Sequence, residues 1–209
     1  MATRKRTRQV RGDAKREAIL AAAWDVFREA GYPAASMDEI TRRAGGSKMS
    51  VYAHFGGKDE LFAAVVRWRA KIVAGSYTIS VAPAKSTDET IAALATAVAD
   101  GMTSATVRDL HRVALSAQPK GAEIGRLLYE HGTLQVIRRV AEIIEARMKA
   151  GDLKPDDPVA AAEALFGLLL GTGYIRFALG VPDRQTAAGR KKHVARAVSI
   201  FLDAYRSQS

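Results

Sequence analysis

Apolar residues recur at helical spacing along most of the chain, and no stretch alternates in the way a half-buried strand does. The first such stretch predicts a helix over about residues 13–30, with Ile19, Ala23 and Phe27 on its inner face. Further helices are expected over about 36–43, 47–54, 58–77, 86–103, 106–117, 119–150, 158–180 and 184–206. The pattern therefore predicts an all-α fold.

The two short helices between residues 36 and 54 carry clear start and stop signals. Ser36 and Glu39 have the spacing of a capping box, and Ser47 can cap the second helix. Gly45 and Gly46 allow a sharp corner between them, because glycine adopts positive φ at little cost. Two short helices joined this way form a helix-turn-helix, which can place its second helix in the DNA major groove.

The residue groups in this region follow one another without gaps: Ile19-Leu20-Ala21-Ala22-Ala23, Phe27, Gly31-Tyr32, Met37-Asp38-Glu39-Ile40, Ala44-Gly45, Ser47-Lys48, Val51-Tyr52-Ala53-His54-Phe55 and Lys58-Asp59-Glu60-Leu61-Phe62. On these residues, segment 16–65 resembles the DNA-binding domain of the TetR family of bacterial transcriptional regulators. Two departures are Gly46, where the family usually has a small apolar residue, and Met49, where it has a smaller side chain. A scattered likeness between residues 110 and 161 is to the efflux- and quorum-linked regulators of that family.

The resemblance implies which side chains touch DNA. The matching positions are Thr41, Arg42, Ser47, Lys48, Met49, Tyr52, His54 and Lys58. Lys48 can donate to a phosphate or a guanine, Tyr52 can donate its hydroxyl to a phosphate, and Met49 can press on a thymine methyl. The alternatives are a merely solvated helix face and, for His54, a structural role.

The chain is strongly basic, which suits a polyanionic partner. Its 209 residues carry a net charge of +10, and seven of the first sixteen residues are Lys or Arg. We expect residues 1–12 to form a basic arm without secondary structure. Its side chains are expected to lie along phosphates or enter a narrow minor groove, the alternative being a solvated tail. The arm residues that we assign to DNA are Arg4, Lys5, Arg6 and Arg8.

Little in the sequence suggests an enzyme, a cofactor or a metal site. The chain has no Cys, and His111, His131 and His193 lack the spacing of metal ligands. The glycines between Gly167 and Gly173 follow no strand, so they do not indicate a nucleotide loop. Charges at Glu163 and Arg176 interrupt the most apolar stretch, and no signal peptide precedes the chain's helices, so we expect a cytoplasmic protein without a membrane span.

The expected organisation is a DNA-binding domain over residues 1–60 and a helical regulatory and dimerisation domain over residues 61–209. The last two helices carry more apolar surface than one small domain needs to cover, which predicts a four-helix interface in a homodimer. The interface residues expected are Leu165, Phe166, Leu169, Gly173, Phe177, Val194, Val198, Phe201 and Tyr205.

The regulatory domain is expected to enclose a small-molecule effector. The lining expected is Trp68, Met102, Leu110, His111, Leu128 and Phe166. Because it is mainly apolar, an apolar or amphipathic effector is favoured. The function expected is a repressor that binds a palindromic operator as a homodimer and is released by that effector. The alternatives are a ligand-independent DNA-binding regulator, an all-α enzyme and a scaffold without a DNA role.

Overall fold

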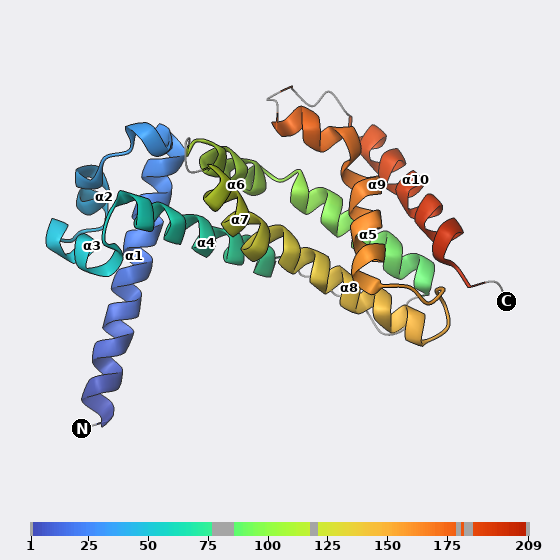
Figure 1. Ribbon diagram of the computed structural model, residues 1–209, viewed down its shortest axis with the longest axis horizontal. Helices are drawn as coiled ribbons and strands as arrows, with labels where there is room; N and C mark the ends of the chain where they lie inside the picture. The colour runs from blue at the N-terminus through green and yellow to red at the C-terminus, as the bar shows by residue number, and fades with distance from the viewer. Residues whose placement is uncertain (1, 77–85, 118–120, 179–180, 182–185, 208–209) are drawn as a thin grey trace. The chain divides into compact units, whose positions relative to one another are not determined.

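The computed structural model describes residues 2–76, 86–117, 121–178, 181 and 186–207, and for residues 2–11 and 178 it describes the backbone alone. Within these ranges the elements are helices, and the only bridge between extended residues joins Leu153 to Arg206 (Figure 1). The all-α prediction is confirmed. The chain forms two compact units, Met1–Ala74 with Ala105–Gly132, and Gly75–Ser104 with Thr133–Ser209. This division is spatial, so the functional boundary at residue 60 stays a prediction.

The first helix, α1 (Ala2–Ala34), begins earlier than predicted. We expected an arm without secondary structure over residues 1–12, because these residues show no apolar period. The backbone from Ala2 is nevertheless helical, in keeping with the good helix propensity of Arg, Lys and Gln. Near its other end, Gly31 has φ +72 and ψ 168, which interrupts the helix where the sequence predicts a stop.

The first unit is completed by α2 (Met37–Arg43), α3 (Lys48–Phe55), α4 (Lys58–Ser76), α6 (Ala105–Leu115) and α7 (Gly121–Leu128). Helix α1 contacts α2 and α6, and α6 contacts α7 (Figure 1). Three aromatic rings join α1 to α4. Phe62 packs edge-on against both Phe27 and Tyr32, with ring centroids 4.8 Å apart in each pair. Phe27 and Phe62 are almost fully buried, so this aromatic cluster is part of the core of the unit.

The long helix predicted over residues 119–150 is helical through its described part but is not uniform. Helix α7 leads into a π-helical turn over Tyr129–Thr133, and α8 (Leu134–Lys149) follows. Gly132 lies in this turn and is buried. The two units also meet along the chain here, since one ends at Gly132 and the other resumes at Thr133.

The second unit contains α5 (Thr87–Met102), α8, α9 (Pro158–Ala178) and α10 (Ala187–Tyr205). Helix α9 packs against α5, α8 and α10, and α10 also packs against α5. Ser86 and Glu89 form a capping box at the start of α5. The chain end is tied to that start, because Arg206 donates two hydrogen bonds to Asp88 at 2.7 and 2.8 Å.

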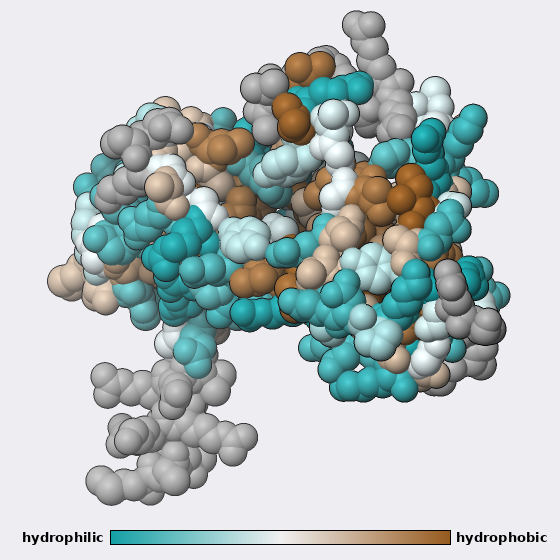
Figure 2. All heavy atoms as spheres, turned by 45° about the vertical axis from the view of Figure 1, so that its right-hand side comes forward, coloured by the Kyte–Doolittle hydropathy of each residue, from teal (hydrophilic) through white to brown (hydrophobic). Residues whose placement is uncertain are grey.

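Helix α9 is apolar but poorly covered within the chain. Among the described residues, Pro158–Phe177 is long and apolar enough to cross a membrane, and the bent pair α5 and α6 passes the same test together. A core helix of a soluble protein also passes this test, so the finding is weak support for a span. Only 28% of the apolar window of α9 is buried, and in Figure 2 apolar side chains gather on the second unit. This helix therefore has apolar surface left to cover.

Substitution of Phe201 in α10 tests the assignment of this residue to the core of the second unit, because its side chain is only 1% exposed. Phe201→Ala should lower the free energy of unfolding by about 3–5 kcal/mol through lost burial and a residual cavity. Ser199→Ala, an exposed change in the same helix, should stay within about 0.5 kcal/mol. Urea unfolding of both variants at one protein concentration checks this, and equal midpoints would contradict the core assignment.

Candidate nucleic-acid interface

Helices α2 and α3 form the predicted helix-turn-helix. The Ser47 side chain caps α3 by accepting a hydrogen bond from the Ser50 amide at 3.2 Å. Gly45 has φ +60, as the corner requires. The Ser36 hydroxyl caps α2 by accepting a hydrogen bond from the Asp38 amide at 3.2 Å, one residue before the Glu39 amide that the predicted capping box would use. The carboxylate of Glu39 binds arginines instead, because charged, bidentate hydrogen bonds are stronger than a bond to an amide.

Helix α3 has one buried face and one open face. Val51 and Phe55 are buried, and they hold the helix on the unit. Met49 is 80% exposed and Tyr52 is 45% exposed. A large thioether side chain left in water contributes nothing to the core of this unit, so the open face is suited to an external partner.

Lys48, on the same open face, is paired with an acid of the preceding helix. Its ammonium lies 2.5 Å from the Asp38 carboxylate, and this hydrogen bond raises the pKa of Lys48. Both side chains remain largely exposed, so the pair is weak and exchangeable. A phosphate or base can therefore replace Asp38 as the partner of this ammonium.

Arginines of α2 form a second charged group. Arg42 donates two hydrogen bonds to Glu39, at 2.8 and 2.7 Å. Arg43 donates to Glu39 at 2.7 Å and binds Glu29 of α1 through two bonds at 2.9 and 2.8 Å. The bonds from Arg42 and then from Arg43 lower the pKa of Glu39 to about 2. Arg43 thus braces α2 against α1, whereas the Arg42 side chain remains 71% exposed and accessible to a ligand.

The other predicted contacts near the turn differ in accessibility. Thr41 is buried and its hydroxyl donates to the Met37 carbonyl at 2.8 Å, which does not favour a phosphate contact. Lys58 donates to the Pro33 carbonyl at 3.1 Å and lies over the Tyr32 ring, 4.9 Å from its centroid. His54 is exposed at the end of α3. His54 is therefore accessible to a ligand, whereas the side chains of Thr41 and Lys58 bind backbone carbonyls of the first unit.

The arm residues Arg4, Lys5, Arg6 and Arg8 lie on the helical backbone of α1, and their side chains are outside the described part of the structure. Their contact with DNA stays a prediction. Unlike the arm expected from the sequence, these residues belong to the same helix as the later part of α1.

The six residues predicted to line an effector site are divided between the units. Trp68, Leu110, His111 and Leu128 belong to the first unit, and Met102 and Phe166 to the second. His111 is buried, its Nδ1 lies 2.9 Å from the Val107 carbonyl, and burial lowers its pKa. It is therefore neutral near pH 7. The lining as a whole stays a prediction.

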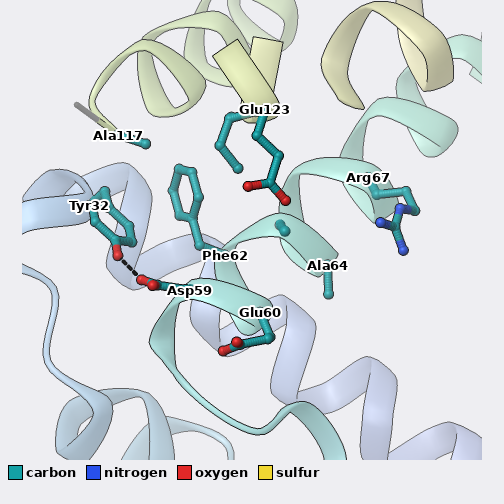
Figure 3. A pocket seen from close by; sticks show the side chains of 10 residues that line it. Tyr32, Asp59, Glu60, Phe62, Ala64, Arg67, Ala117 and Glu123 are labelled. Atoms are coloured by element: carbon teal, nitrogen blue, oxygen red, sulfur yellow. Dashed lines mark hydrogen bonds between the residues drawn. The ribbon is translucent and has the colours of Figure 1, made fainter. Parts of the chain in front are cut away.

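A cavity of about 410 Å³ lies in the first unit, and its lining includes none of those six residues (Figure 3). Helix α4 contributes most of its wall, including Asp59, Phe62 and Arg67, and Glu123 of α7 faces them. Tyr32 also lines it and donates its hydroxyl to Asp59.

The backbone amide of Tyr32 donates to the Ser116 hydroxyl at 3.0 Å. Tyr32 therefore connects the end of α1 to the start of α4 and to the residue after α6. Sequence reasoning missed this junction, and the Gly31-Tyr32 pair is its only local signal.

The predicted interface residues fall into two groups by burial. Leu165, Phe166, Leu169 and Phe201 are buried within the chain, which makes them core residues of the second unit. Gly173 is exposed, and Phe177, Val194, Val198 and Tyr205 are partly exposed. Large exposed apolar side chains nearby, absent from the prediction, are Tyr174, Ile175 and Ile200. Apolar periodicity cannot separate these groups, because a side chain buried in its own core and one buried by a partner obey the same spacing.

Comparison with known families identifies the chain. A family model described as bacterial regulatory proteins of the tetR family matches residues 19–65. A second, described as the C-terminal domain of AefR-like transcriptional repressors, matches residues 89–207, more than half of the chain. The chain belongs to the TetR family. TetR-family proteins are DNA-binding transcriptional regulators and not enzymes, so the predicted family, helix-turn-helix and non-enzymatic class are confirmed.

Individual TetR-family and helix-turn-helix regulators resemble parts or the whole of the chain. The transcriptional activator FasR of Mycolicibacterium smegmatis is 51% identical over 55 residues, which are 26% of this chain and 25% of the activator. The chain thus matches a quarter of that relative's length. The uncharacterised regulator YhgD of Bacillus subtilis is 24% identical over 160 residues, covering 75% of this chain and 81% of that protein.

Solved structures of regulators extend the likeness over nearly the whole chain. A TetR-family regulator from Mesorhizobium loti has a TM-score of 0.82 at 28% identity, covering 94% of this chain and 98% of that one. The flavonoid-responsive regulator FrrA has a TM-score of 0.79 at 27% identity and covers 94% of this chain and 100% of its own. A TetR-family regulator from Pseudomonas syringae is 30% identical, with a TM-score of 0.71 and coverage of 93% and 98%.

The open face of α3 generates a prediction that separates binding from folding. Met49→Ala and Tyr52→Phe should weaken binding to a selected operator duplex, because they remove exposed groups that can reach DNA, and should leave the unfolding midpoint unchanged. Val51→Ala, a change on the buried face, should instead lower the free energy of unfolding by about 2 kcal/mol. Fluorescence anisotropy with labelled duplex and thermal unfolding measure the two effects. Operator affinity unchanged in both surface variants would contradict this role for α3.

Proposed function

We propose that this TetR-family regulator is a repressor that binds a palindromic operator as a homodimer and is released by a small apolar or amphipathic effector. The observation that carries its DNA-binding part is the open face of α3, where Met49 is 80% exposed beside Lys48 and Tyr52. The repressor assignment is supported by the match of residues 89–207 to AefR-like repressors. The match to the activator FasR makes activation the alternative sign of regulation.

A dimer is needed because one helix-turn-helix reads only a few base pairs. Two copies related by a two-fold axis read an inverted repeat, which multiplies the contacts and the specificity. The exposed apolar residues of α9 and α10 support a contact between copies at these helices. We place the proposed interface on the exposed residues Tyr174, Ile175 and Ile200, together with Gly173, Phe177, Val194, Val198 and Tyr205. The buried residues Leu165, Phe166, Leu169 and Phe201 are assigned to the core of the second unit.

Near the turn, operator contacts are proposed for the accessible groups only, which are Arg42, Ser47, Lys48, Met49, Tyr52 and His54. The arm residues Arg4, Lys5, Arg6 and Arg8 are proposed from the sequence alone. Ser47 can combine its capping role with a phosphate contact through its backbone amide, as helix N-termini commonly do. Thr41 and Lys58 are left out, because both already serve the fold.

Effector release is supported by the likeness to FrrA, whose name describes it as flavonoid-responsive. A flavonoid combines flat aromatic rings with a few hydroxyls, which is the amphipathic chemistry expected from the apolar residues of the regulatory segment. A ligand shifts the equilibrium only by its differential affinity for the two states. A ligand-independent regulator is the alternative, and the test below separates the two.

The signal has a physical route within the first unit. Ser116, directly after α6, accepts from the Tyr32 amide at 3.0 Å and donates to the Val113 carbonyl at 2.7 Å. Tyr32 in turn binds Asp59, at the start of α4. A small displacement of the end of α6 therefore acts on α1, which packs against α2 of the helix-turn-helix, and on the start of α4.

Random-site selection with the purified protein should return an inverted repeat. Ile175→Asp should then sediment as a monomer and lose affinity for that repeat, because it places a carboxylate on the proposed interface. The matched control is Ala146→Asp, which adds a carboxylate to an exposed position of α8 and should leave the dimer intact. A selection without an enriched motif, or an Ile175→Asp variant that still sediments as a dimer and binds the repeat, would contradict the proposal.

A flavonoid panel should include compounds that quench tryptophan fluorescence and lower operator affinity. The expected coupling is roughly 5- to 150-fold, and by linkage the operator should weaken effector binding by the same factor. Ser116→Ala should bind the effector normally but reduce the coupling, because it removes the bond to Tyr32, whereas Thr106→Ala in α6 should behave as wild type. Compounds that bind and leave operator affinity unchanged would favour the ligand-independent alternative.

A further inference from the structure

Lys15, midway along α1, reaches the turn of the helix-turn-helix. Its ammonium donates to the Gly45 carbonyl at 2.9 Å and lies 3.4 Å from the Ala44 carbonyl. These carbonyls directly follow α2, where unpaired backbone acceptors and the negative end of the helix dipole lie together. A cation is therefore favourable at this position, and it is held by a residue 30 positions away in sequence.

The same ammonium occupies the space that a side chain at residue 46 would need. A Cβ added to Gly46 would lie 2.8 Å from Lys15 Nζ and 3.2 Å from its Cε. Both distances are shorter than normal contacts, so a side chain at position 46 would require the flexible end of Lys15 to shift away from its present position.

We infer that Lys15 and Gly46 are a matched positioning pair, in which the ammonium holds the turn and so fixes the direction in which α3 is presented to DNA. Lys15 would otherwise be counted as one more phosphate contact of the basic α1 helix. Its two carbonyl contacts assign it to the turn instead. The inference rests on the proposed operator binding and adds a determinant of specificity that does not itself touch a base.

Fixing the conformation of the turn should affect sequence-specific contacts with bases more than the nonspecific attraction to DNA phosphates. Base-edge contacts need α3 within hydrogen-bonding geometry, whereas phosphate attraction tolerates a range of orientations. If the turn loosens, only a fraction of the free protein is ready to bind, and the apparent affinity falls by that fraction. Loss of the pair should therefore lower operator affinity while sparing affinity for random duplex.

A double-mutant cycle tests the pair in the full-length protein, with the duplex from random-site selection and a shuffled duplex. A charge at a helix terminus corresponds to roughly a two- to five-fold effect per subunit, or roughly 4- to 25-fold for two half-sites. Lys15→Ala should weaken operator binding by this factor. Gly46→Ala should have a smaller effect of the same sign in the wild-type background, because it only shifts the ammonium, and almost none in the Lys15→Ala background, where no ammonium is present.

The salt dependence separates positioning from phosphate binding. Removing a phosphate contact reduces the slope of log affinity against log salt by ~0.9 for each contact, or ~1.8 for two subunits. Lys15→Ala should leave the slope unchanged. Lys71→Ala is the charge-matched control on the exposed surface of α4, and Gly125→Ala, where an added Cβ meets nothing within 4 Å, is the glycine control. Hydrogen exchange over residues 44–55 should increase in Lys15→Ala and Gly46→Ala but in neither control.

Three results would overturn the inference. A reduced salt slope in Lys15→Ala would make Lys15 a phosphate contact. Additive effects in the cycle, with no faster exchange over residues 44–55, would make Gly46 independent of Lys15. If the wild-type protein binds the selected and shuffled duplexes equally, operator reading itself fails, and the inference falls with it. In the first two cases wild-type discrimination survives, so the two failures are distinguishable.

Discussion

The fold of the first unit, which carries the helix-turn-helix, depends on the aromatic cluster of Phe27, Tyr32 and Phe62. It joins α1 to α4 at the place where Gly31 breaks α1, so the chain can turn back towards α2 without losing its core. Because α3 has few buried residues of its own, it cannot hold its position alone. Helix α1 packs against α2, and α2 packs against α3, so these contacts allow a helix of eight residues to leave large side chains in water.

The basic side chains around α3 that can attract DNA are paired with acidic side chains of the same unit. Lys48, Arg42 and Arg43 each have an acidic partner within the unit. Binding to a phosphate therefore exchanges one ion pair for another, and the gain is smaller than a free cation would give. Such pairing holds long side chains in defined positions and favours sites whose geometry fits all of them, which limits indiscriminate binding by a chain with net charge +10.

Local signals predicted the helices well, whereas signals that depend on distant residues did not. The Ser47 cap and the Gly45 corner depend on residues only a few positions away, so they are visible in the sequence and are found as expected. The carbonyl contacts of Lys15 and the Tyr32–Ser116 bond join residues 30 and 84 positions apart, which no local pattern encodes. Sequence periodicity likewise does not distinguish Phe201, which is buried within the chain, from a residue that a partner buries, since periodicity reports burial but not which surface does the burying.

The π-helical turn at Tyr129–Thr133 changes the helical phase of the residues that follow it in α8. A π turn holds one residue more than an α turn, and in an α-helix each residue advances the direction of the side chains by about 100°. One inserted residue therefore shifts the helical phase of every later position by one residue relative to an unbroken α-helix. The buried positions of α7, Ile124 and Leu127, and those of α8, Val136, Val140 and Ile144, need not follow one uninterrupted i, i+3, i+4 pattern. The shift in phase falls where the chain passes from one unit to the next.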